Sequence, residues 1–184
     1  TLFFVSDRDG AERLYMMNTD TKAVTPVTMD DADVSMLRLT PDKSKVSFWK
    51  AGKSGGLYTV SVMGGTPTQV WSRPGGMQYY AWSPDGKYFA YSETLLRSGF
   101  YYWDAASNVY IVDPSNKKSV NVTQLSAEHI LPQWTPDGKY LLFRSNRAGD
   151  GLYALALNPE SARDTELDMK YEKPTGPIHV QIVW

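Results

Sequence analysis

The sequence contains no cysteine among its 184 residues. This absence excludes disulfide bonds, thiolate nucleophiles and cysteine-ligated zinc, although it leaves the cellular compartment open. Histidine is almost as scarce, because only His129 and His179 are present to act as a general base or a metal ligand. Histidine chemistry is therefore limited to two positions, and cysteine chemistry is excluded.

An excess of charge of one sign is lacking too, since 19 basic and 20 acidic residues leave a formal net charge of −1. A chain so balanced has no general attraction for nucleic acid or for an anionic membrane surface. No apolar run approaches the roughly 18 to 20 residues of a membrane-spanning helix. The opening TLFFVSDRDG also lacks the basic region and cleavage site of a signal peptide, so any export signal is expected outside this chain. We expect no nucleic-acid partner and no membrane insertion.

Helical periodicity is missing before residue 160, because no stretch places apolar residues at i, i+3, i+4 and i+7 over three turns. The apolar residues instead form short runs rich in Val, Phe, Tyr and Leu, such as SKVSFWK, KYFAYSE and KYLLFRS, bounded by Gly, Pro, Asp or Asn. With 42% hydrophobic residues the chain has the composition of a folded globular protein. The sequence therefore predicts an all-β fold.

An internal repeat organises these runs. The phrase WSPDGKYFAYS at 82–92 returns as WTPDGKYLLFR at 134–144, and its aspartate recurs at Asp42, Asp85 and Asp137, separated by 43 and 52 residues. A tyrosine inside a short apolar run recurs with the matching separations 43, 52 and 43, at Tyr15, Tyr58, Tyr110 and Tyr153. The two markers agree, and one unit carries about nine extra residues before its tyrosine.

A period of about 43 residues that holds four short antiparallel strands is typical of a β-propeller blade. We expect blades at about 1–30, 34–71, 77–124 and 130–157, followed by a charged spacer at 158–176 and the start of a further strand at 177–184. The expected architecture is a single propeller of six or seven blades, of which about four are present in this chain. The alternative is a four-bladed ring in which the terminal PIHVQIVW pairs within the first blade.

The repeated phrase has the chemistry of a hairpin turn. In the segment 83–86, SPDG, proline presets φ at the second position, aspartate can accept bonds from nearby N–H groups, and glycine accepts a positive φ. Trp82 and Trp134, just before the turn, are expected to fill the wedge between adjacent blades. Lys43 stands where the other two turns have glycine, so its turn is predicted to be strained or of a different type.

These residues carry a family resemblance. Over about 1–157, WSPDGKYFAYS, NVYIVD, NVTQL and FFVSDRDGAERLYMMN resemble the TolB-type propeller repeat. The region that follows, together with the long loop of the third unit, resembles the propeller of tricorn-like serine proteases. Pro177, Val180 and Ile182 fit the strand at which that family resumes, with Trp184 in the aromatic place, whereas Val183 departs from it by standing where an aspartate is usual.

The resemblance implies a non-catalytic propeller that gates or docks peptides for a serine protease domain elsewhere in the parent chain. The partners it implies are a peptide or protein substrate and the other domains of that parent. The alternative is a TolB-like propeller that binds a protein partner in the cell envelope. By analogy with such bacterial proteins, a periplasmic or extracytoplasmic location is expected.

No catalytic, cofactor-binding or metal-binding residue is assigned. His129 and His179 are each next to or within an expected strand, and no Gly-x-Ser-x-Gly segment accompanies them, so both are interpreted as ordinary strand histidines. Two acidic groups suggest calcium loops but lack a full ligand set, and hairpin chemistry explains both. They consist of Asp7 and Asp9 before Gly10, and of Asp30, Asp31 and Asp33.

One segment offers a candidate contact surface. The long loop of the third unit contains four consecutive aromatics where a solvated loop would be polar, namely Phe100, Tyr101, Tyr102 and Trp103. They are predicted either to cover the neighbouring blade or to form an apolar surface for a peptide or partner.

Overall fold

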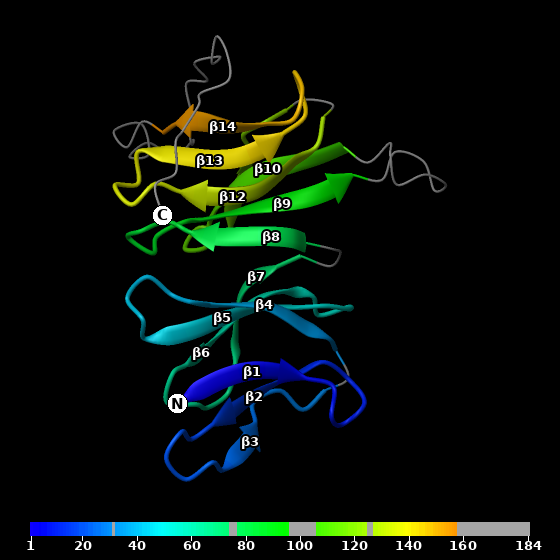
Figure 1. The fold of residues 1–184 in the computed structure, drawn as a ribbon, viewed down its shortest axis with the longest axis vertical. Coiled ribbons are helices and arrows are strands. Elements are labelled where there is room, and N and C mark those ends of the chain that lie inside the picture. The colour runs from blue at the N-terminus through cyan, green and yellow to red at the C-terminus, as the bar shows by residue number, and fades with distance from the viewer. Residues whose placement is uncertain (31, 74–76, 96–105, 125–126, 158–184) are drawn as a thin grey trace. The chain divides into compact units, whose positions relative to one another are not determined.

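The computed structural model describes residues 1–30, 32–73, 77–95, 106–124 and 127–157 (Figure 1). All regular structure in these ranges is β-strand, in four antiparallel sheets. The described residues include no helix with the length and hydrophobicity of a membrane span. The prediction of an all-β fold of propeller blades is confirmed. The spacer at 158–176 and the strand expected at 177–184 lie outside the described residues.

The chain divides into two compact units, Thr1–Gly76 and Met77–Trp184. The first unit holds a three-stranded sheet and a four-stranded sheet, which we call the first and second sheets. Their strands are β1 (Leu2–Ser6), β2 (Arg13–Met17) and β3 (Val24–Pro26), then β4 (Val34–Leu39), β5 (Lys45–Lys50), β6 (Gly56–Ser61) and β7 (Thr68–Ser72). Within each sheet the strands lie in sequence order, as a meander.

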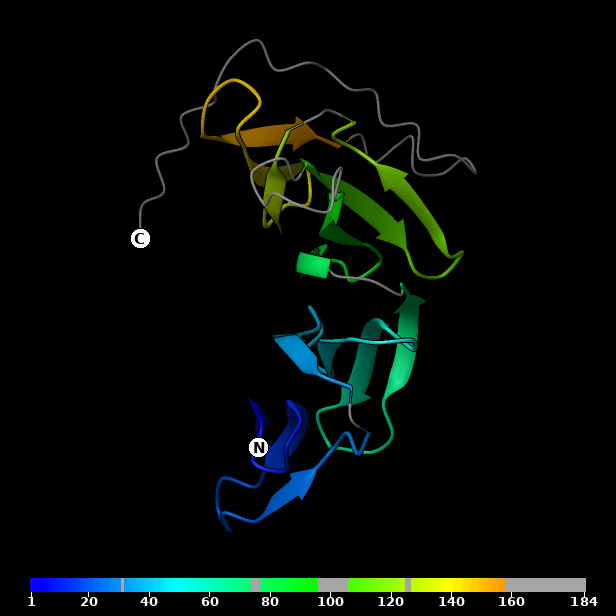
Figure 2. The same cartoon turned by 90° about the vertical axis from the view of Figure 1, so that its right-hand side faces the viewer.

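The second unit also holds two sheets, a four-stranded third sheet and a three-stranded fourth sheet, which Figure 2 shows from the side. Their strands are β8 (Met77–Trp82), β9 (Phe89–Leu95), β10 (Ala106–Asp113) and β11 (Lys118–Asn121), then β12 (His129–Trp134), β13 (Tyr140–Ser145) and β14 (Gly151–Ala156). Strand β12 lies against β8, β9 and β10 of the third sheet. The fourth sheet therefore packs on the third.

Each unit has its own apolar core between its two sheets. In the first unit Leu14 from the first sheet packs with Val34, Val46, Phe48 and Val60 from the second. In the second unit Ala90, Val109, Ile111 and Val122 of the third sheet pack with Leu141, Phe143, Tyr153 and Leu155 of the fourth. The alternation of apolar residues along the strands places these side chains on one face, and burying that face against the next sheet stabilises both.

The repeated S/T-P-D phrase forms the same turn in all three places. Ser83 Oγ donates to Asp85 Oδ1 at 2.7 Å and accepts from the Tyr88 N–H at 2.9 Å, while Asp85 Oδ1 also accepts from the Lys87 N–H at 3.1 Å. The turns that begin at Thr40 and Thr135 repeat all three bonds. The predicted hairpin between the first and second strands of a blade is confirmed.

Lys43 keeps this turn rather than changing it. Its φ is +58°, close to the +71° of Gly86 and the +70° of Gly138. A left-handed backbone costs an L-residue about 1–2 kcal/mol. Of the two predicted outcomes, strain is the one found, because the hydrogen bonds of the turn hold lysine in the glycine conformation.

A bulge interrupts the opening strand of each of the last three sheets, a feature that the sequence did not predict. The register shifts between Ser35 and Arg38 in β4, between Met77 and Tyr79 in β8 and between Ile130 and Gln133 in β12. At two of the bulges a non-glycine residue adopts a positive φ, +55° at Met36 and +58° at Leu131. An extra residue in one strand locally increases the twist of the pair.

Candidate functional site

Each complete blade presents two kinds of end. One end carries the S/T-P-D turn. The other, which we call the loop end, carries the connection between the second and third strands and the start of the first strand. Because β9 stops at Leu95 and β10 begins at Ala106, the long loop of the third unit starts and finishes at a loop end. The predicted contact residues 100–103 lie outside the described residues, so their role stays a prediction.

Stacked aromatic pairs lie beneath the loop ends. The recurring tyrosine pairs across the strands with a second aromatic in every sheet, and the rings stack with interplanar angles of 14–20°. The pairs are Phe4–Tyr15, Phe48–Tyr58, Tyr91–Tyr110 and Phe143–Tyr153, with centroids 5.7, 5.9, 5.1 and 6.2 Å apart. The tyrosine period of the sequence thus marks a cross-strand stack in each sheet.

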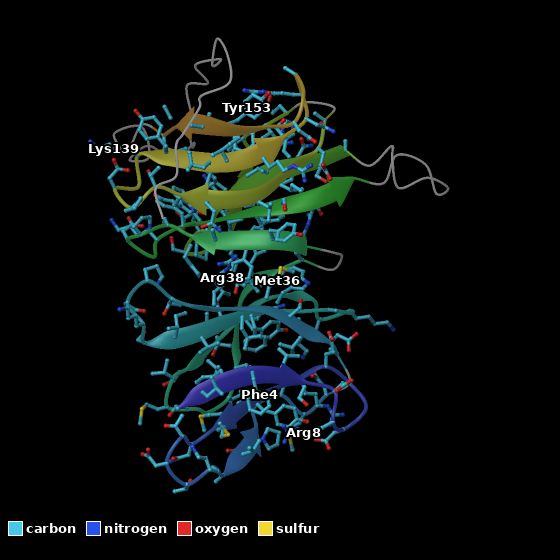
Figure 3. All side chains as sticks on the ribbon, in the orientation of Figure 1. Phe4, Arg8, Met36, Arg38, Lys139 and Tyr153 are labelled. Carbon is cyan, nitrogen blue, oxygen red and sulfur yellow. The ribbon has the colours of Figure 1, made fainter. Side chains whose placement is uncertain are left out.

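A basic side chain covers three of these stacks. The Arg8 guanidinium carbon lies 5.2 Å from the Phe4 ring centroid and 4.8 Å from that of Tyr15, and Figure 3 labels Phe4 on β1 with Arg8 in the loop that follows. Arg147 lies 4.1 Å from the Tyr153 centroid, and Lys50 lies 5.3 Å from that of Tyr58. Each cation is attracted by the negative face of a ring. The loop ends therefore combine aromatic and positive groups.

The acidic residues considered as metal ligands take part in local bonds. Asp7 accepts from the Gly10 N–H at 2.8 Å through its backbone carbonyl, as in a hairpin turn. Asp9 accepts a hydrogen bond from the Tyr15 hydroxyl, and this bond is the main cause that raises the pKa of Tyr15. Asp30 forms an ion pair with Lys50.

Asp33 Oδ1 accepts from the Glu12 N–H at 3.3 Å, and Asp31 lies outside the described residues. The part of the chain that the structure describes brings no three His, Asp or Glu side chains together as metal ligands would be.

His129 is fully buried in β12, at 0% exposure. Its ring meets Phe143 edge-on at 5.7 Å, and neither imidazole nitrogen has a hydrogen-bond partner among the described residues. Burial lowers the pKa of His129 to about 4, with a smaller contribution from Arg147. The imidazole is thus a neutral group sealed inside the protein, which agrees with its interpretation as a strand histidine. His179 lies outside the described residues.

The turn aspartates at the opposite end have lowered pKa values. Hydrogen bonds from the hydroxyls of Ser44 and Thr40 and from the Ser44 N–H lower the pKa of Asp42 to about 2. Burial alone would raise the pKa of Asp85, but the bonds from Ser83 and the Lys87 N–H outweigh it and lower that pKa. These carboxylates support the turn, and their contribution is lost only as the pH falls through the range below about 4.

Sequence reasoning missed the cations above the aromatic stacks. Their signal was present, because serine precedes arginine by two positions in both SDR at 6–8 and SNR at 145–147. In each case the serine Oγ accepts from the arginine N–H, at 3.3 Å in the first unit and 3.2 Å in the second. The repeated serine therefore fixes the loop that carries the arginine.

Two bacterial proteins are among the curated relatives to which the chain is similar. It is 30% identical over 105 residues to an uncharacterized protein of Agrobacterium fabrum, covering 57% of this chain and 31% of that protein. It is 26% identical over 99 residues to dipeptidyl-peptidase 5 of Porphyromonas gingivalis, covering 52% of this chain and 14% of that enzyme. The chain thus spans less than a third of each relative. No family model matches it.

Solved structures share the fold. The tricorn protease matches with a TM-score of 0.67 at 14% identity, over 85% of this chain and 17% of the protease. TolB from Acinetobacter baumannii matches with a TM-score of 0.59 at 22% identity, over 80% and 35% of the two chains. An oligogalacturonate lyase in complex with manganese matches with a TM-score of 0.65 at 17% identity, over 85% and 44%.

Identities this low establish the fold and nothing finer, since propellers of one architecture serve unrelated functions. The resemblance of the sequence to TolB-type blades is confirmed, with tricorn protease and TolB both among the structural neighbours. The chain is therefore built of β-propeller blades, which resemble those of TolB and of the tricorn protease.

Proposed function

We propose that this chain is a non-catalytic propeller region of a tricorn-like serine peptidase, which docks or gates peptides for a catalytic domain outside the chain. The aromatic segment 100–103 would supply part of the peptide contact. The location that goes with this role is extracytoplasmic.

The burial of His129 is the observation that carries the non-catalytic part of the proposal. A serine triad needs an imidazole within hydrogen-bond reach of a nucleophile that a substrate can approach. His129 is the one histidine within the described residues, and it is 0% exposed. The similarity to a dipeptidyl-peptidase over 99 residues supports a connection with peptide processing, and the chain covers only 14% of that enzyme.

Two measurements on the full 184-residue chain test the proposal. Hydrolysis of fluorogenic peptides should stay at the rate of the buffer blank, because no accessible triad is expected in the chain. Fluorescein-labelled casein peptides should bind, as fluorescence anisotropy would detect. Turnover of peptides would overturn the non-catalytic role, and absence of peptide binding would overturn peptide docking.

A pair of variants locates the contact. Exchanging Tyr101 and Trp103 for Ser should weaken peptide binding about tenfold or more, because buried aromatics dominate such contacts. Tyr140→Ser is the matched control, since Tyr140 is an aromatic of the same unit, 44% exposed, at the start of β13 beside the opposite, turn-bearing end. Equal weakening by both changes would contradict a contact in the long loop.

The TolB-like alternative is favoured by the TolB match at a TM-score of 0.59. A propeller of that kind would bind a folded envelope protein instead of short peptides. Failure of every casein peptide to bind, together with capture of one folded partner through the same aromatic segment, would replace the first proposal with this one.

A further inference from the structure

His129 faces the third sheet from the fourth. It pairs across the strands with Ser145, which shares one face of β13 with Phe143. Phe143 belongs to the core against the third sheet, and the His129 ring meets it edge-on. The imidazole therefore lies in the interface between the two sheets of the second unit.

Ser92 occupies the matching face of the third sheet. It follows Ala90 by two positions on β9 and pairs with Val109, and both neighbours belong to the core against the fourth sheet. The next residue on that face of β10, Ser107, donates its N–H to the carbonyl of Ala127 at 3.1 Å, beside the start of β12. Ser92 and His129 thus lie at the same end of one interface.

The first unit provides an internal comparison. The Val5–Leu14 pair of the first unit is equivalent to the Ser92–Val109 pair of the second. In the same way, the Val34–Lys50 pair is equivalent to the His129–Ser145 pair.

Both valines pack in the core between the first and second sheets. At these two equivalent positions, the first unit therefore has two valines and the second unit has a serine and a histidine.

Close packing of the two sheets does not require polar side chains at these two positions. Ser92 and His129 are each 0% exposed, and neither the serine Oγ nor either imidazole nitrogen has a hydrogen-bond partner within the described ranges. Buried polar groups without partners destabilise a fold, whereas valine at the same position does not incur that cost. The pair is therefore a weak point in an otherwise apolar interface.

Among the charged groups near His129, Arg147 makes its protonation more costly. Arg147, in the loop after β13, is the one that acts on it, and it disfavours a second positive charge. Glu128 precedes His129 and Glu93 follows Ser92 on the facing sheet, both half-buried, while Arg144 pairs with Asp150 at 3.3 Å near the surface. Burial is the larger cause of the lowered pKa, and Arg147 adds to it.

We propose that His129, buried in the same interface as Ser92, acts as an acid-sensitive latch, so that protonation of the imidazole loosens the third sheet from the fourth while the valine-lined interface of the first unit stays packed. The direction of this pH effect follows from the difference between the pKa of the imidazole in the open and the closed interface. The pKa of the imidazole is about 6.5 when exposed and about 4 when buried, so the interface is fully stable above pH 6.5 and loses stability as the pH falls toward 4.

Hydrogen exchange on the full chain tests the latch. Between neutral pH and about pH 4.5, opening of β12 and β13, corrected for intrinsic exchange, should increase roughly 50- to 100-fold. Strands β5 and β6 should show no comparable change. The double variant Ser92→Val, His129→Val copies the first unit, and it should remove the increase and strengthen protection at neutral pH. An equal increase in that variant would assign the effect to other groups and overturn the latch.

A second measurement needs no substitution in the interface itself. With only two histidines in the chain, NMR can follow both imidazoles as the pH is lowered, and His179→Gln identifies their signals. The latch requires a His129 pKa well below 6.5 in the folded protein and a loss of β12 protection as the pH falls from 6.5 toward that pKa. A folded-state pKa near 6.5, or unchanged β12 protection across this range, would refute it.

Discussion

At the scale of single residues, Lys43 shows what the turn demands. Its backbone is left-handed at +58°, as at the two glycines of the equivalent turns. Lys43→Gly should raise the free energy of unfolding of the first unit by up to about 1 kcal/mol, because removing the strain outweighs the entropy that glycine loses on folding. Urea denaturation measures the difference.

Gly138→Lys is the reciprocal change and should lower the stability of the second unit by a similar amount. A Cβ at Gly138 would have Pro84 Cδ as its nearest neighbour, at 3.8 Å, so the cost would be conformational rather than steric. If Lys43→Gly were neutral or destabilising, the lysine side chain would have to make a compensating contact in the folded state.

Residue-level reasoning from the sequence succeeds where one side chain sets the local backbone. The Pro, Asp and Gly of the repeated phrase predict the turn because each restricts or satisfies the backbone by itself. His129 could be placed in a strand but not in an interface, because its environment depends on Phe143 and Ser92, which are distant in sequence. Alignment with Val34 would have marked it as a polar residue at an apolar position.

At the scale of elements, the stacked pair under a cation is the recurring unit. Arg8→Met keeps the length of the side chain but removes the charge over Phe4 and Tyr15, so it should destabilise the first unit by about 1 kcal/mol. Arg8→Lys retains the charge and should cost less. Thermal or urea unfolding of the two variants compares these values, and equal losses would show that the positive charge over the rings contributes nothing to stability.

The bulges show a feature of the strands that the sequence pattern did not predict. Short apolar runs bounded by turn residues predicted β5, β9 and β13, and each of these pairs with the strand that follows it without a register shift. In β4 and β12 an extra residue at Met36 and Leu131 shifts the alternation partway along. No local propensity favours a positive φ at methionine or leucine, so these positions follow from the pairing of whole strands.

At the scale of the whole molecule, each of the two units is stabilised by an apolar core of its own. Phe48→Ala should cost the first unit about 3–5 kcal/mol, because the side chain is fully buried in the core between the first and second sheets. Hydrogen exchange should show lost protection in β1 to β7 with β9 to β14 still protected. Phe143→Ala should give the converse pattern. Uniform loss from either change would mean that the chain unfolds as one cooperative unit.

The repeat period predicted the fold because each blade must bury its faces against its neighbours, so the same pattern of apolar strands returns once per blade. The period holds no information on which interface is apolar and which is polar. That difference arises at single positions within identical frameworks. Function depends on such positions too, which is why the fold followed from the sequence more completely than the candidate site did.

The indole N–H of Trp134 forms a hydrogen bond from the fourth sheet to the third. Its Nε1–H donates to the backbone carbonyl of Ala81 at 3.1 Å, as expected for a ring in the wedge between blades, whereas Trp82 packs edge-on against Phe89 of its own sheet. Six tryptophans give six indole N–H resonances. The one from Trp134 is a built-in spectroscopic reporter, whose chemical shift and lifetime record, without any label, whether the two sheets are joined.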